Sequence, residues 1–314
     1  MKAALIKTQS VGNRLPSSLQ GNMKQFARII VILFLAGTTF KAVEPGLPSK
    51  TAVYVTAARA VGSKDPDPQL RNPDYLAIKF LGPRERAVLP DLPMDALDLD
   101  FDGAMKQLGA HLLVAVMTYR TKVFDAALLD AVQNGATQVV VLGAGFDSRA
   151  YRFQSQLGNV RVMEVDYGPT QAYKKQRLGE ILDVMPSNVS FVPMDFTKDN
   201  LLEQLRNAGY SEQQKTFFLW EGVSYYLPES AVKDTLHFVR DHSASGSRIA
   251  FDYTGANNPA INNPLHLYAR WGEPFLFGFP NSSAREYVQQ EGLGVLSDTQ
   301  GLEYICIAEV LNKR

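Results

Sequence analysis

The sequence lacks the residues from which several kinds of protein site are built. It has one cysteine, Cys306, and four scattered histidines, so it offers neither an internal disulfide nor a Cys/His cluster, and we predict no metal site. It also lacks a charge surplus, since 32 basic residues stand against 32 acidic ones, which disfavours a nucleic-acid partner. With 46% hydrophobic residues over 314 positions, the chain is long enough to bury a core without disulfide bonds or a structural metal ion.

Acidic residues are absent from the first 43 positions, which hold six lysines and arginines. The apolar run 29–37 is shorter than the ~18 residues of a membrane-spanning helix but fits the ~7–15 residues of a signal-peptide core. We therefore treat residues 1–48 as a basic, apolar leader and keep three interpretations open. In the first the leader is a signal-like segment, and in the second it associates with a membrane through residues 24–42. In the third it is disordered or comes from an over-long gene start.

The rest of the chain, residues 49–314, changes its pattern near position 137. Residues 49–136 carry helical patterns, for which we expect helices over 51–61 and 97–118 and around 124–132. From 137 onward, short buried strands alternate with helices, which predicts a doubly wound, mainly parallel α/β sheet behind an N-terminal helical cap. The strands are expected at 138–142, 160–165, 189–192, 216–220, 248–251, 295–301 and 303–310. An irregular insertion near 253–290 is expected to act as a lid.

A glycine turn follows the first expected strand. Gly143 and Gly145 let the backbone come close to a ligand, and Asp166 ends the next strand 23 positions after Gly143, near the spacing of an acid that binds ribose hydroxyls. A tight turn into a helix would explain the glycines equally well. The dinucleotide fingerprint is incomplete, because Ser148 stands where glycine or alanine is needed and Asp147 would repel a pyrophosphate. S-adenosylmethionine has ribose but no phosphate, and fits this turn better than a nicotinamide cofactor does.

Five segments in this order resemble the leucine carboxyl methyltransferase family, and within it the bacterial S-adenosylmethionine-dependent O-methyltransferases. They are 51–60 (TAVYVTAARA), 119–125 (YRTKVFD), 141–152 (VLGAGFDSRAYR), 164–166 (EVD) and 220–223 (WEGV). The resemblance implies a class I methyltransferase fold, Rossmann-like, with seven strands of which the last is antiparallel, capped by N-terminal helices. It covers about residues 50–310.

The resemblance also implies a set of residues that bind the cofactor, S-adenosyl-L-methionine. Arg120 is expected to pair with its methionine carboxylate, Asp166 to accept its ribose hydroxyls, and Glu221 to lie near its ammonium or sulfonium. Asp195 and Phe196 are expected to recognise its adenine. The predicted cofactor-binding set is Arg120, Gly143, Gly145, Asp166, Asp195, Phe196 and Glu221. Ordinary structural roles remain open for some of them, such as a surface ion pair for Arg120 and a turn for Asp195.

The predicted function is methyl transfer to a carboxyl or hydroxyl oxygen of a small molecule or peptide. No nucleophilic residue is needed, and no catalytic residue is predicted, although a hydroxyl acceptor would require a base. Base candidates are Glu221, Tyr225, Tyr226 and Asp252. A non-catalytic module that binds the cofactor, and less favourably a nicotinamide-dependent oxidoreductase, are the alternatives. Because the cofactor is cytosolic, we expect a cytoplasmic protein, with membrane association through 24–42 as the open question.

Overall fold

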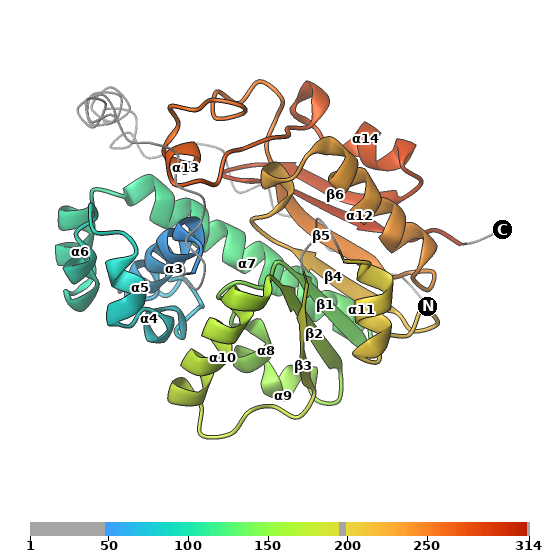
Figure 1. Cartoon of the computed structure of the whole chain (residues 1–314), viewed down its shortest axis with the longest axis horizontal. Coiled ribbons are helices and arrows are strands. Elements are labelled where there is room, and N and C mark those ends of the chain that lie inside the picture. Colours follow the sequence, from blue (N-terminus) through green and yellow to red (C-terminus); the bar gives the residue numbers. More distant parts are fainter. Residues whose placement is uncertain (1–47, 195–198, 313–314) are drawn as a thin grey trace. The chain divides into compact units, whose positions relative to one another are not determined.

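The computed structural model describes residues 48–194 and 199–312, so residues 1–47 of the predicted leader lie outside the described part. None of the helices in that part combines the length and hydropathy needed to cross a bilayer. The described part begins with a group of helices, drawn in blue to green in Figure 1. They are α3 (Lys50–Gly62), α4 (Ala77–Phe80), α5 (Pro83–Ala87), the 3-10 turn η1 (Met94–Asp98), α6 (Phe101–Leu108) and α7 (His111–Gln133).

The prediction of one helix over 97–118 is wrong, because the helix is interrupted at Gly109. Gly109 ends α6 in the left-handed conformation, with φ at 59°, and its amide donates to the carbonyl of Met105. A glycine takes this conformation without a side-chain clash, and so the helix stops and the chain restarts as α7. The helix expected around 124–132 belongs to this same 23-residue helix.

The sheet has seven strands in the order β3-β2-β1-β4-β5-β7-β6. The first five pair in parallel, whereas β7 pairs antiparallel with both β5 and β6, which confirms the predicted doubly wound, mainly parallel α/β class and the C-terminal hairpin. The strands are β1 (Gln138–Leu142), β2 (Arg161–Asp166), β3 (Val189–Pro193), β4 (Thr216–Trp220), β5 (Arg248–Tyr253), β6 (Gly294–Gln300) and β7 (Tyr304–Glu309).

Helices cover both faces of this sheet, as Figure 1 shows. Alternate residues of β1 enter two separate cores: Val139 and Val141 pack toward α3 and α7, while Val140 and Leu142 pack toward α12. Burial on both faces explains why the strands are continuous apolar runs. The helices that follow β1 are α8 (Arg149–Arg152), α9 (Gln154–Leu157), α10 (Gly168–Ile181), α11 (Leu201–Asn207), η2 (Ser224–Tyr226), α12 (Glu229–Asp241), α13 (Leu267–Arg270), η3 (Pro280–Ser282) and α14 (Arg285–Gln290).

The strand order reverses between β1 and β4. The chain leaves β1 toward β2 on one side and returns to β4 on the other, so the connections diverge at the carboxyl ends of these two strands. In open α/β sheets this divergence leaves a crevice in which ligands bind. The fold therefore places the glycine turn after β1 and Glu221 after β4 at the edges of one crevice.

Candidate functional site

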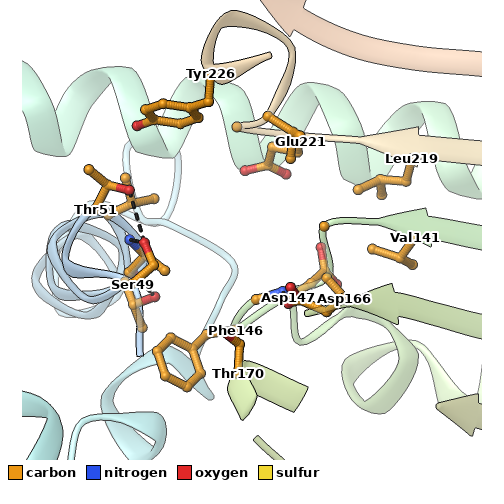
Figure 2. Close-up of a pocket in the computed structure, with 18 of the residues that line it drawn as sticks. Ser49, Thr51, Val141, Phe146, Asp147, Asp166, Thr170, Leu219, Glu221 and Tyr226 are labelled. Carbon is orange, nitrogen blue, oxygen red and sulfur yellow. Dashed lines mark hydrogen bonds between the residues drawn. The ribbon is translucent and has the colours of Figure 1, made fainter. Parts of the chain in front are cut away.

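A cavity of about 280 Å³ opens at this crevice. Its walls come from the start of α3, from the glycine turn after β1, from the ends of β2 and β4, and from the insertion between β5 and β6. Five of the predicted cofactor-binding residues line it, namely Arg120, Gly143, Gly145, Asp166 and Glu221. The other two, Asp195 and Phe196, lie outside the described residues. Figure 2 shows Asp147 and Asp166 on one side of the cavity and Thr51 and Tyr226 on the other.

The glycine turn is held against the end of β2 through Asp166. One carboxylate oxygen of Asp166 accepts from the Gly145 amide at 2.5 Å, and the other accepts from the Tyr167 amide at 2.6 Å. Burial raises the pKa of Asp166 above its ordinary value, and the two amides partly offset that rise. Each oxygen keeps lone pairs for a ligand, so this carboxylate is fixed in place while still able to accept hydroxyl hydrogen bonds.

Gly143 combines a left-handed backbone with close packing. Its φ is +70°, and a Cβ there would lie 2.5 Å from Cγ2 of Val223. Gly145, with φ at +40°, would meet other atoms only at 3.9 Å or beyond. Gly143 is therefore required by its left-handed backbone and by the close approach of the loop after β4, whereas Gly145 leaves open space toward the cavity.

Replacing Gly143 with alanine is expected to lower the free energy of unfolding by about 2–4 kcal/mol, from left-handed strain and overpacking together. Gly135→Ala is the matched control, because its φ is +92° and no atom lies within 4 Å of the added Cβ. It should lose only about 1–2 kcal/mol. Urea unfolding measures both. The double variant Gly143→Ala/Val223→Ala should recover part of the loss. Equal losses in Gly143→Ala and Gly135→Ala would contradict the packing argument.

Arg120 and Glu221 meet at the floor of the cavity. Arg120 projects from α7 and is 3% exposed. Its Nε lies 2.9 Å from Oε1 of Glu221, and its Nη1 donates to Oδ2 of Asp252 at 2.9 Å. The surface ion pair considered for Arg120 is therefore wrong, because both of its partners are buried with it. Its Nη2 makes no hydrogen bond within the described part of the chain and is the nitrogen left for a ligand.

Arg149 is a buried residue that lies outside the predicted cofactor-binding set. It is 2% exposed and lies behind the glycine turn, where its Nε donates to Asp125 at 2.7 Å. Its Nη1 contacts Asp147 and lies 2.8 Å from Oε2 of Glu221. Burial alone would raise the pKa of Glu221, but Arg149 and Arg120 hold that pKa below its ordinary value. Arg149 thus ties the glycine turn, α7 and the end of β4 together and keeps two cavity carboxylates ionised.

The insertion between β5 and β6 closes the other side of the cavity through Glu273. Its carboxylate accepts from the Ser49 hydroxyl at 2.8 Å, from the Lys50 amide at 2.9 Å and from the Thr51 hydroxyl. These donors form the first turn of α3, where a negative charge is also favoured by the helix dipole. No local sequence signal predicts this contact, because Glu273 and Lys50 are 223 positions apart.

Aromatic side chains surround this same side of the cavity. Tyr225 and Tyr226 follow β4, and their ring centroids lie 4.4 Å and 5.1 Å from that of Phe275 in the insertion. Burial raises the pKa of both tyrosines, so both hydroxyls stay protonated at neutral pH. The two hydroxyls can donate hydrogen bonds but are poor bases, and Asp252 is already bound to Arg120.

Comparisons with known proteins show what this chain is similar to in sequence and in fold. A family model described as leucine carboxyl methyltransferase matches residues 52–240. A "Putative S-adenosyl-L-methionine-dependent methyltransferase" of Mycolicibacterium gilvum is 34% identical over 226 residues, which are 68% of this chain and 71% of that protein. One of the same name in Mycobacterium avium is 34% identical over 230 residues, 70% of each chain. A solved structure of a "putative methyltransferase" from Thermobifida fusca, 14% identical, covers 86% of this chain and 97% of its own with a TM-score of 0.52, which shows a shared fold.

Proposed function

Because the chain belongs to the leucine carboxyl methyltransferase family and is an S-adenosylmethionine-dependent methyltransferase, we propose that it methylates a carboxyl oxygen of a small molecule or peptide. A hydroxyl oxygen is the second candidate acceptor. Bound S-adenosylmethionine supplies a methyl group already activated by its sulfonium. The residues of the chain then have to bind the cofactor, align the acceptor and exclude water.

The cavity fits the cofactor in several respects. Gly145 leaves backbone space beside Asp166, whose carboxylate is oriented to take the ribose hydroxyls. Nη2 of Arg120 makes no hydrogen bond within the described part of the chain, so this guanidinium keeps donors for a carboxylate of the ligand. We propose that Arg120 holds the methionine carboxylate and Glu221 the ammonium or sulfonium, with Asp195 and Phe196 at the adenine.

One observation carries the preference for a carboxyl acceptor: every carboxylate among the described residues of the cavity wall is already bound by donors. Asp147 and Glu221 are paired with Arg149. Asp166 is held by two backbone amides and Glu273 by the start of α3. A carboxyl acceptor is ionised at neutral pH and needs no base, whereas a hydroxyl acceptor would need one of these groups to be free.

The acceptor is proposed to enter on the side of Tyr226 and Glu273. The protonated hydroxyl of Tyr226 lines the cavity there and can donate to an acceptor oxygen without removing a proton from it. The neighbouring rings of Tyr225 and Phe275 exclude water from that side. Positioning by donors and by apolar contact is sufficient for transfer to an oxygen that is already nucleophilic.

The experiment is transfer of a labelled methyl group from S-adenosylmethionine to a fractionated cell extract by the full chain. A carboxyl ester releases the label as methanol in mild base, and an ether keeps it. We expect base-labile product, and its formation should be lost in Arg120→Met. Base-stable product would move the proposal to the hydroxyl acceptor. Absence of labelled product in every fraction, with the cofactor bound, would contradict oxygen methylation by this chain.

A further inference from the structure

A buried carboxylate, that of Asp252 near the end of β5, lies behind two parts of the cavity wall. Its Oδ2 accepts from Nη1 of Arg120 at 2.9 Å, and its Oδ1 accepts from the backbone amide of Gly222 at 2.6 Å. Arg120 and Gly222 both line the cavity, whereas Asp252 is fully buried and does not line it. One carboxylate therefore holds a side chain from α7 and the backbone that follows β4.

Asp252 is itself fixed in place. Its strand pairs with β4 on one side and with β7 on the other. The Ser224 hydroxyl donates to its backbone carbonyl at 2.6 Å, and the Tyr225 hydroxyl donates to Oδ2 at 3.4 Å. Burial raises the pKa of Asp252, and Arg120 and the Gly222 amide offset part of that rise. The carboxylate is thus a rigid support for the groups that it binds.

The guanidinium of Arg120 has two anchors. Its Nε lies 2.9 Å from Oε1 of Glu221, and its Nη1 is bound by Asp252. Two anchors on a planar group fix its plane, and they also fix the direction of the third nitrogen, Nη2. Without Asp252 the guanidinium would keep only the anchor at Nε, and it would be free to turn about that contact.

Gly222 lies close to this third nitrogen. Its φ is +73°, and a Cβ built there would lie 3.8 Å from Nη2 of Arg120. The backbone after β4 thus passes beside the guanidinium, and the same carboxylate binds both. Asp252 therefore sets the position of Arg120 relative to the wall beside it.

We propose that Asp252 is a positioning residue of the cofactor site, which orients the guanidinium of Arg120 so that Nη2 faces the methionine carboxylate of S-adenosylmethionine. This inference rests on the cofactor site proposed above. Asp252 acts through Arg120 and does not touch the cofactor. The competing role is purely structural: Asp252 would join α7 to β5, and its loss would then weaken every ligand of the cavity alike.

Two ligands separate these roles. The reaction product S-adenosylhomocysteine carries the methionine carboxylate, whereas methylthioadenosine keeps the adenosine and the sulfide but ends in a methyl group. Asp252→Asn offers one acceptor oxygen to two donors, so either Arg120 or the Gly222 amide loses its partner. In calorimetric titration of the full chain, we expect its affinity for S-adenosylhomocysteine to fall about tenfold to 100-fold, the contribution of a hydrogen bond to a charged group. Its affinity for methylthioadenosine should be unchanged.

The matched control is Asp130→Asn. Asp130 lies on α7, as Arg120 does, and it pairs with Arg248 at the start of β5. It thus joins the same helix to the same strand, but its side chain is 53% exposed. This variant should bind both ligands as the parent does.

Two further variants test the dependence on Arg120. Arg120→Lys keeps the positive charge but replaces the planar fork with a single nitrogen, so it should lose affinity for S-adenosylhomocysteine and keep it for methylthioadenosine. The double variant Asp252→Asn/Arg120→Met should lose no more than Arg120→Met, because the two residues act through one contact.

Each other outcome counts against a stated part of this picture. Equal losses for both ligands in Asp252→Asn would leave Asp252 a structural residue and overturn the inference. Unchanged or higher affinity for S-adenosylhomocysteine in that variant would also overturn it, and the proposed function would stand. If Asp252→Asn does not fold, Arg120→Lys decides, since parent-like affinity there would show that charge without orientation is sufficient. If the parent binds neither ligand, the proposed cofactor site itself fails.

Discussion

Replacing Arg149 with methionine is expected to lower the free energy of unfolding by about 3–5 kcal/mol, the range for breaking a buried ion pair from one side. Methionine fills much of the volume but leaves Asp147 without its guanidinium partner, Asp125 with only Arg152 and Glu221 with only Arg120. Because these carboxylates are buried, water cannot replace the lost contacts. Urea unfolding at neutral pH measures the change.

An exposed arginine supplies the control. Arg206 pairs with Glu212, but its side chain is 57% exposed, so Arg206→Met should cost less than about 1 kcal/mol. The loss in Arg149→Met should also shrink in acid. Burial raises the pKa of Asp147, but Arg149, Lys174 and the Arg149 amide together hold it below its ordinary 3.8, and stability from such a group is lost as pH falls. If Arg149→Met and Arg206→Met lose similar free energies of unfolding, the buried ion pairs of Arg149 do not hold the site together.

Replacing Asp166 with alanine is expected to weaken binding of S-adenosylmethionine at least about 100-fold. Two hydroxyl hydrogen bonds to a carboxylate are lost, and each hydrogen bond to a charged group contributes about 1.5–3 kcal/mol. Titration calorimetry measures the affinity. Asp166→Asn should lose less, since it keeps one acceptor oxygen, and Asp183→Ala, an exposed aspartate after α10, should bind as the parent does.

Stability has to be measured beside affinity in Asp166→Ala, because this carboxylate also accepts from the Gly145 and Tyr167 amides. A variant that stays folded at the titration temperature yet binds weakly supports the ribose role. Unchanged affinity in a folded Asp166→Ala would remove Asp166 from the proposed cofactor site.

The sheet could be predicted from the sequence because each strand has a local signal, a short apolar run bounded by turn residues. The runs that became β1 and β4 are apolar after their first residue, as is typical of strands buried on both faces, and turn residues bound them. Gly143 and Asp166 could be paired because about 20 residues separate the glycine turn from the acid at the next strand end in this kind of fold. The break at Gly109 was missed because apolar spacing continues on both sides of that glycine.

The charged contacts of the site could not be predicted, because they join distant parts of the chain. Arg120 and Asp252 are 132 positions apart, and no periodicity relates them. Asp252 was therefore considered as a base, whereas its carboxylate is bound by Arg120. Glu273 likewise reaches the start of α3 only because the insertion after β5 folds back over the cavity. Such pairs are set by tertiary packing, and only the folded chain reveals which of its many acids and bases meet.

A crystal structure of the full chain with S-adenosylhomocysteine shows whether this cavity holds the cofactor through Arg120, Asp166 and Glu221. We expect the ribose hydroxyls on the carboxylate of Asp166, the methionine carboxylate on the guanidinium of Arg120, and the sulfur facing the side of Tyr226. A ligand bound elsewhere, or one in this cavity with its ribose away from Asp166, would contradict it.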